Sequence, residues 1–318
     1  MKFKITLIAL SIAATPAFAK LADEQGFSGE VSINAGVTSS TSNFNTDGDS
    51  TLTSNTQKAS SESSFLVAPL GNIAYTFGER LNHQVYTGTA RDDVATGTVV
   101  LEVGYKYQLQ SGMVIDASVL PTIMSGETWA DPYNTTGPRS KTDEKGNAFR
   151  LKLSSIAGSP FSLDMAYATR DVEQDDVPDE LKRDGNALYL KGQYRQPLSR
   201  SLMLVPSIIY QTRDADGSAE SYDQIGAEVS LFGVAGRHQY VLTAGYNQRD
   251  YDGGNSLYNN TVRSDDNINL FAAYEYEKFM NWDNWSFISL AGYGTSDSNI
   301  TFYDESQYIV SVGMNYKF

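Results

Sequence analysis

SQYIVSVGMNYKF, residues Ser306 to Phe318, stands at the C-terminal end of the chain and carries its most regular pattern. Every second residue from Tyr308 to Phe318 is apolar, and the residues between them are polar or glycine, except for Ile309. A period of two is typical of a β-strand with one apolar and one polar face. A globular protein would seldom end on such a strand with an aromatic last residue, so we predict a strand that faces lipid.

The same stretch resembles the closing strand of bacterial outer-membrane β-barrels, which typically end in Phe after alternating aromatic residues. The resemblance implies that Tyr316 and Phe318 belong to a signal that the barrel-assembly machinery recognises, and this machinery is therefore an expected partner. The alternative is the last strand of an ordinary soluble β-sandwich.

The N-terminus predicts export. Residues 1–19 contain Lys2 and Lys4, an apolar run and the small-residue site Ala17-Phe18-Ala19, which together have the form of a cleaved signal peptide. No stretch approaches the roughly 18 consecutive apolar residues of a membrane helix. An exported chain that stays in a membrane must then span it as a barrel. We expect a signal peptide over 1–19 and one barrel domain over 20–318, located in the outer membrane of a Gram-negative bacterium.

Composition excludes several classes of function. The chain has no cysteine, so disulfides, thiolate metal sites and cysteine nucleophiles are excluded. Its formal charge of −14 makes nucleic-acid binding improbable, because phosphate groups are also negative. Much of the acid lies in polar segments that we interpret as outer loops, where divalent cations could bridge it to anionic lipid or lipopolysaccharide; plain solvation of the loops is the simpler explanation.

The rest of the chain divides into segments of alternating hydrophobicity separated in turn by short turns and longer polar loops, which predicts an all-β, antiparallel, up-and-down transmembrane barrel. The predicted strands are residues 27–37, 65–77, 85–90, 98–110, 113–124, 148–156, 161–170, 188–196, 202–213, 225–232, 240–249, 268–279, 285–294 and 306–318. This gives about fourteen strands, an even number that places both termini at one end. Twelve is the alternative, because 85–90 and 285–294 have the weakest pattern.

Three segments carry a further resemblance. Trp129-Ala130-Asp131-Pro132-Tyr133, Asp216-Gly217-Ser218-Ala219 and the run from Asp297 to Asp304 are similar to parts of an uncharacterised family of Gram-negative outer-membrane proteins, catalogued only as a domain of unknown function. The similarity runs over the whole mature chain. It implies a barrel and a location, but no activity and no site residues.

Motifs for catalysis and for metal binding are weak. The two histidines, His83 and His238, fall at predicted periplasmic turns of different hairpins, so neither reaches the outer rim and we expect no enzyme activity. Acid pairs such as Asp175-Asp176 and Asp265-Asp266 have the character of solvated loop residues. The segments 45–49 and 214–217 are similar to the start of a calcium loop but lack its twelfth-position glutamate, and Asx turns explain them. We expect no metal and no cofactor.

The predicted lumen is charged, and this decides the functional hypothesis. Inward positions of the strands hold Arg150, Lys152, Arg170, Lys191, Arg195, Arg213, Arg249, Glu30, Glu102, Glu275 and Glu277. The basic residues of three consecutive strands would form one wall and the glutamates the opposite wall, setting a transverse field across a water-filled pore. The leading hypothesis is a porin-like channel for passive diffusion of small hydrophilic solutes. The alternative is a non-conducting structural, adhesion or receptor barrel that acts through its loops, with the charged residues forming bracing salt bridges.

Overall fold

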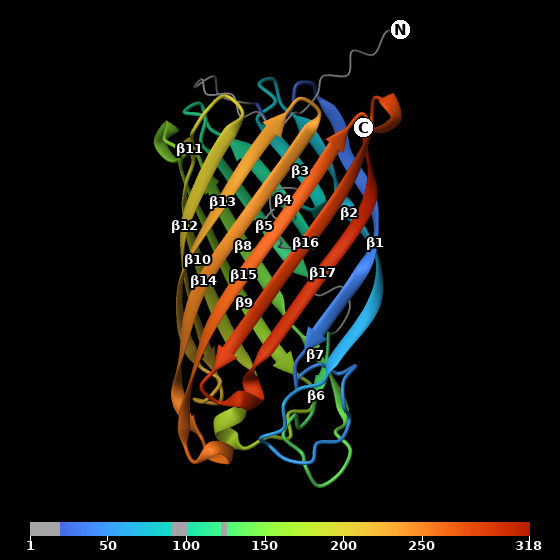
Figure 1. Ribbon diagram of the computed structural model, residues 1–318. Helices are drawn as coiled ribbons and strands as arrows, with labels where there is room; N and C mark the ends of the chain where they lie inside the picture. Colours follow the sequence, from blue (N-terminus) through green and yellow to red (C-terminus); the bar gives the residue numbers. More distant parts are fainter. Residues whose placement is uncertain (1–19, 91–93, 95–100, 122–125) are drawn as a thin grey trace.

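The structure, a computed structural model, describes residues 20–90, 94, 101–121 and 126–318. It is a closed antiparallel β-barrel of fourteen strands (Figure 1). The strands are β1 (Gly26–Thr41), β2 (Ser61–Phe77), β3 (His83–Thr89), β4 (Leu101–Gln108), β5 (Val114–Pro121), β8 (Asn147–Ser154), β9 (Phe161–Val172), β10 (Gly185–Tyr194), β12 (Leu202–Ala215), β13 (Tyr222–Ala235), β14 (His238–Asn255), β15 (Thr261–Glu277), β16 (Trp285–Ser298) and β17 (Glu305–Lys317). The predicted fold and the count of fourteen are confirmed, and the alternative of twelve is not. The expected signal peptide lies outside the described residues.

Closure of the barrel joins the two ends of the chain. β1 pairs with β2 on one side and with β17 on the other, in register from Glu30 opposite Lys317 to Thr41 opposite Ser306. Phe318 continues this seam, because its N–H donates to Gly29 O at 2.9 Å and its carbonyl accepts from Gly29 N–H at 3.0 Å. Each of the fourteen strands therefore has two neighbours, although among the described residues β2 pairs with β3 only from Asn72 to Phe77 and its residues 61–71 pair with β1 alone.

The two ends of the barrel differ in their connections. At one end, which we call the turn end, short connections join the strands in pairs, and the start of β1 and the C-terminus lie nearby (Figure 1). The opposite end, which we call the loop end, carries the long connections. The long connection between β5 and β8 contains a small antiparallel ribbon at this end, formed by β6 (Gly126–Trp129) and β7 (Lys141–Lys145), and β7 also pairs with the end of β9.

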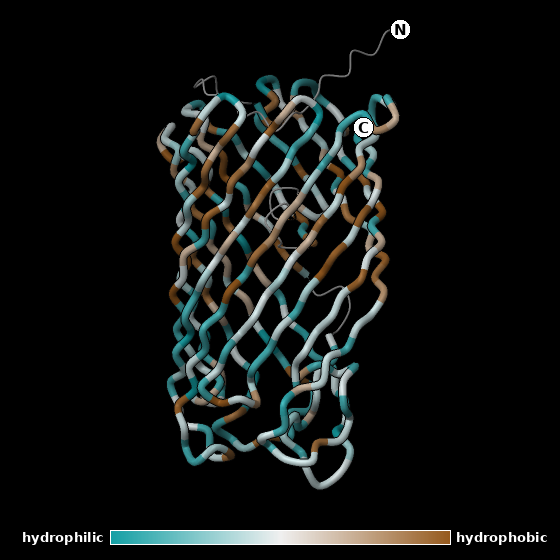
Figure 2. Tube along the Cα trace, in the orientation of Figure 1, coloured by the Kyte–Doolittle hydropathy of each residue, from teal (hydrophilic) through white to brown (hydrophobic). Residues whose placement is uncertain are grey.

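The barrel wall has its apolar side chains on the outside. Phe27, Ile33 and Ile208 are 75, 66 and 68% exposed, whereas the buried residues of the strands are mostly polar. Figure 2 shows hydrophobic residues spread over the wall between polar ends. Among the residues that the structure describes, no helix has the length and apolar character needed to cross a bilayer. The wall is thus built to bury its outer face in an apolar environment.

Strand ends at the turn end agree closely with prediction, but several strands extend further toward the loop end. β14 and β15 reach residues 255 and 261, so most of the predicted loop 250–266 is a hairpin, with an irregular register between Asp250 and Gly254. Polar residues form these extensions, where no lipid imposes an apolar alternation. Within the predicted strand 188–196, β10 ends at Tyr194, and a two-residue strand, β11 (Gln196–Pro197), follows and also pairs with β12.

The connections at the loop end pack into a compact unit that we call the cap. Its buried core comes from five different connections and consists of Leu52, Tyr133, Val177, Leu181, Ala219, Ile300, Phe302 and Tyr303, with Phe44 and Tyr258 packed against it. Leu181 belongs to a short 3₁₀ helix, η2 (Asp179–Leu181), and the Phe302-Tyr303 pair to another, η5 (Thr301–Tyr303). Segments far apart in sequence therefore form one small hydrophobic core over the loop end.

Candidate functional site

The candidate site is the interior of the barrel, and strand register determines which side chains reach it. Successive side chains of a strand alternate between its two faces, so residues paired across the ladder share a face. Of the predicted lumen residues, all but Arg195 lie within described strands at inward positions. Arg195 follows the end of β10 and is exposed at the turn end, because the strand stops one residue before it.

A buried ion-pair cluster occupies the wall formed by β3, β4, β5, β8 and β9. Arg150 lies between two carboxylates: its Nη1 is 3.1 Å from Glu102 Oε1, and its Nε donates to Asp164 Oδ1 at 2.9 Å. Lys152 is 4.0 Å from the same Glu102, whose side chain is only 1% exposed. Ser118 Oγ donates to Glu102 at 2.7 Å. Buried charges of opposite sign that share hydrogen bonds satisfy one another, so this cluster braces the wall.

Tyr86 extends the cluster across β3. Its ring lies over Gly104, where a Cβ would meet the ring at 2.5 Å, and its hydroxyl donates to Asp116 at 2.7 Å. Lys106 lies 3.8 Å from Asp116 and 4.5 Å from the centre of the Tyr86 ring. The glycine is needed at 104 because any larger side chain would displace the tyrosine.

The other side of the interior holds separate pairs. Lys191 donates to Glu228 at 2.6 Å, and Lys317 lies 2.7 Å from Glu275 and 3.3 Å from Glu277. Next to them, Asn315 donates to Glu30 at 2.9 Å. Each cation thus has a carboxylate beside it.

The predicted division into a basic and an acidic wall is wrong in its arrangement. Glu102 belongs to the same cluster as Arg150 and Lys152, since β4 is only two strands from β8 in the barrel. Lys317 neutralises the glutamates at the seam. The charges therefore compensate locally, and the transverse field expected from two unlike walls is reduced.

Arginines gather toward the loop end, beneath the cap. Arg263 pairs with Asp265 at 2.7 Å and lies over the rings of Tyr251 and Tyr303. Arg249 is 3.9 Å from the same Asp265, which is fully buried. Arg213 donates to the backbone carbonyl of Arg183 at 2.6 Å. The sequence pattern missed Arg263 and Asp265, which it placed in a solvated loop.

The cap also contains buried charge. Arg183 donates through Nε and Nη2 to the same oxygen of Asp175, Oδ1, at 2.9 and 2.6 Å, so Asp175, like Asp265, is an ion-pair partner rather than a solvated loop acid. Glu220 is buried nearby, and its burial raises its pKa above the usual value although Arg263, Arg213, Arg170 and Arg183 act to lower it. Burial likewise raises the pKa of Tyr303. Desolvation of the carboxylate outweighs the field of four guanidinium groups.

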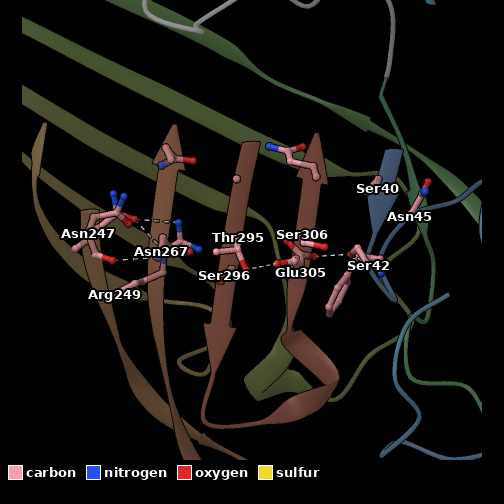
Figure 3. Close-up of a pocket in the computed structure, with 15 residues that line it drawn as sticks. Ser40, Ser42, Asn45, Asn247, Arg249, Asn267, Thr295, Ser296, Glu305 and Ser306 are labelled. Carbon is pink, nitrogen blue, oxygen red and sulfur yellow. Dashed lines mark hydrogen bonds between the residues drawn. The ribbon is translucent and has the colours of Figure 1, made fainter. Parts of the chain in front are cut away.

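An open cavity lies between the cap and the inner face of the strand wall. Its volume is about 530 Å³, and it is lined by amide, hydroxyl and charged side chains of β13 to β17 and β1, together with the start of the first long connection (Figure 3). The lining residues are Ser40, Ser42, Phe44, Asn45, Gln224, Asn247, Arg249, Asn267, Asn269, Gly294, Thr295, Ser296, Glu305, Ser306 and Gln307. Of the predicted lumen residues, only Arg249 lines this cavity.

The family is established by comparison with family models. The model described as protein of unknown function (DUF2860) matches residues 26–317, which is almost the whole barrel. The chain belongs to this family. No curated protein matches.

The DUF2860 barrel is similar to solved outer-membrane structures only at low identity. It resembles the CymD monoaromatic hydrocarbon channel with 11% identity, covering 98% of this chain and 93% of that one, at a TM-score of 0.45. OmpT, an outer-membrane protein of Vibrio cholerae, matches with 10% identity, 94% and 100% coverage and a TM-score of 0.45. The outer-membrane channel DcaP of Acinetobacter baumannii matches with 11% identity, 93% and 97% coverage and a TM-score of 0.42. Likenesses this distant leave the function to be argued from the site.

The two histidines of this DUF2860 chain lie at the turn end, in different hairpins, as predicted. His83 is the first residue of β3 and His238 the first of β14, and each is hydrogen-bonded through Nδ1 to a tyrosine hydroxyl on a neighbouring strand, Tyr105 at 2.6 Å and Tyr274 at 2.7 Å. Both pairs belong to the outward face of the barrel, where aromatic residues cluster. The geometry gives them an interfacial position, away from the cavity.

The first of the two calcium-like segments has the Asx turn that the sequence predicted. The second is held by other backbone hydrogen bonds. Asn45 Oδ1 accepts from Asp47 N–H at 3.0 Å, which is an Asx turn. In the second segment, Asp216 and Gly217 donate their N–H groups to the carbonyls of Asp184 and Lys182. Among the described residues no group of three or more acidic or histidine side chains could hold a metal ion.

Proposed function

We propose that this protein is an outer-membrane channel through which small hydrophilic solutes diffuse. The observation that carries the proposal is the polar cavity of about 530 Å³ inside a closed barrel whose outer face is apolar. A barrel of this size lies between small barrels filled by side chains and the larger porins that hold an aqueous channel. Ion pairs along the inner wall compensate its charge, so that the wall neither excludes nor traps a neutral solute.

The orientation follows from the two ends. We place the turn end, with the start of β1 and the C-terminus, in the periplasm and the cap on the outer side, because short turns and long loops have this arrangement in outer-membrane barrels. The apolar wall would contact lipid, and the cap would lie at the level of lipopolysaccharide. Tyr316 and Phe318, at the seam, are the residues we assign to recognition by the barrel-assembly machinery. Residues 1–19 would direct export and then be removed.

Conductance tests the proposal directly. Purified protein, shown to be folded by its heat-dependent migration in a detergent gel, is inserted into a planar bilayer, and stable conductance steps are expected. Reversing Arg150 and Lys191 to Glu should shift selectivity toward cations, since it removes the cations paired with Asp164 and Glu228 and one of the two beside Glu102.

A matched control reverses two arginines outside the lumen. Arg195→Glu with Arg200→Glu makes the same change of charge at exposed positions of the turn end, and a much smaller shift is expected. Folded protein without conductance would reject the channel, and an equal shift in both double variants would reject the lumen charges as the selectivity element.

A second candidate function, a non-conducting barrel that acts through its outer surface, is favoured by the packed core of the cap. Loops that only fill space need no buried Leu181, Phe302 and Tyr303. If surface recognition is the function, replacing the cap surface changes attachment of a partner, whereas charge reversal in the lumen has no effect.

A further inference from the structure

The cavity beneath the cap is built from two rows of side chains that cross neighbouring strands. In the first row, Asn269, Gly294 and Gln307 are direct partners on β15, β16 and β17. One step nearer the cap, Asn267 of β15 is paired with Asn247 of β14 and with Ser296 of β16. Because paired residues share a face, both rows point into the same space, as Figure 3 shows for the labelled members of the second row.

Gly294 makes a notch between two amides. A Cβ at this position would lie 3.2 Å from Asn269 Oδ1 and 3.5 Å from Gln307 Nε2, so a side chain there would fill the space between them. Within the described part of the chain, neither of these two amide side chains is engaged in a hydrogen bond. Asn269 and Gln307 are exposed to the interior, so their amides remain available to a solute, whereas Asn247 Oδ1 is buried without a hydrogen-bond partner among the described residues. A buried polar atom is normally satisfied, so Asn247 Oδ1 points to water or a ligand.

The charged residues of the cavity are already engaged. Arg249 donates through Nε and Nη2 to Gln224 Oε1 at 3.1 and 2.9 Å, and it lies beside Asp265. Glu305 accepts from Ser42 Oγ at 2.5 Å. An incoming ion would therefore compete with bonds inside the protein, whereas the amides offer free donors and acceptors.

Hydrogen-bond complementarity then selects a class of solute. An amide presents both donors and an acceptor, and a hydroxyl group can satisfy either one. An anion can only accept and an ammonium group can only donate, so each would leave half of the amide groups unpaired. Phe44, which stacks on Tyr303 at 5.3 Å between ring centres, adds an apolar surface to the same cavity. Such a surface suits the C–H face of a sugar ring.

We propose that this cavity is a subsite for a neutral polyhydroxylated solute, a polyol or a small saccharide. The inference rests on the channel function proposed above and names its substrate class. The volume lies within the roughly 300–1,000 Å³ of ligand pockets, and binding there must stay weak enough for the solute to leave.

Swelling of proteoliposomes tests the subsite. The probes are arabinose and glutamine, a neutral polyol and a zwitterion of nearly equal mass, and potassium chloride conductance is measured on the same preparation. Wild-type protein should admit arabinose about threefold faster than glutamine, the effect of roughly one net hydrogen bond. The double variant Asn269→Leu with Gln307→Leu should remove this preference, lowering the ratio of arabinose rate to chloride conductance by about the same factor.

Gln193→Leu is the matched control, because it removes an amide from an inward position of β10 outside the cavity lining, and the ratio should stay at the wild-type value. Equal rates for arabinose and glutamine in a conducting wild-type protein, or a faster rate for glutamine, would overturn the subsite and leave the channel standing. Absence of both swelling and conductance from folded protein would reject the channel itself. The wild-type comparison decides the question even if the double variant does not fold.

Discussion

The wall and the cap of this barrel bury apolar side chains in opposite ways. On the wall, Ile33 and Ile208 face outward, and the interior holds ion pairs such as Arg150 with Glu102. In the cap, Leu181 and Phe302 are completely enclosed by other connections. The wall therefore depends on lipid to bury its apolar surface, whereas the cap has the core of a small soluble domain. The chain therefore contains two regions that are stabilised in different ways, and mutations in one region should leave the stability of the other unchanged.

The largest loss of stability is expected from a substitution in the inner wall. Arg150→Ala leaves two buried carboxylates, Glu102 and Asp164, without their shared cation and should lower the free energy of unfolding by about 3–5 kcal/mol. Denaturant unfolding of the protein in lipid vesicles, followed by tryptophan fluorescence, measures the change. Lys278→Ala is the control, since it removes a solvent-exposed pair with Asp283 and should have no measurable effect. Equal midpoints for both variants would show that the cluster does not brace the wall.

The second largest loss of stability is expected from a substitution in the core of the cap, and it should be confined to the cap. Leu181→Ala removes a fully buried side chain and should destabilise the packed cap by about 2–5 kcal/mol, while the wall stays folded. The readout is the rate of protease cleavage at the loop end, which should rise with no change in the unfolding midpoint of the barrel. Leu257→Ala provides the same substitution at a more exposed position near the cap. A joint loss of cap and barrel would show that the two regions fold as one unit.

The smallest expected effect is a dependence of the stability of the cap on pH. Because the folded-state pKa of Glu220 is raised, its protonated form is favoured in the folded cap. The associated stability is present at low pH and is lost as the pH rises through the folded pKa. Protease cleavage at the loop end should therefore be faster at pH 8 than at pH 5, relative to an unfolded substrate under the same conditions. Glu220→Gln should remove the difference. Slower cleavage at the higher pH would mean that the surrounding arginines favour the charged form.

The sequence predicted the wall well because lipid imposes a strict alternation on it. β17 shows this best: its outward residues, from Tyr308 to Tyr316, are the ones that the period of two identified. Asp265 shows where the pattern fails. It lies beyond the lipid-facing part of β15, where polar residues pair without any apolar alternation, so it was interpreted as part of a loop.

The cap and the cavity depend on information that no local pattern carries. The connection that supplies Leu52 is rich in serine, threonine and asparagine, and only contacts with connections far away in sequence make that leucine a core residue. Asn269, Gly294 and Gln307 form one row because three strands have a particular register. Each residue alone has the composition of an ordinary inward position, so composition could predict a polar lumen but not this arrangement.

The seam between β1 and β17 sets the order in which this molecule can be completed. Gly29 and Phe318, hydrogen-bonded to each other, are separated by almost the entire chain. Hairpins elsewhere can form as soon as both of their strands are present. The barrel cannot close until β17 is available to pair with β1. Contacts of such long sequence separation form slowly. Until then both terminal strands have a free edge, and a catalyst that holds the final strand would protect it from pairing with another chain.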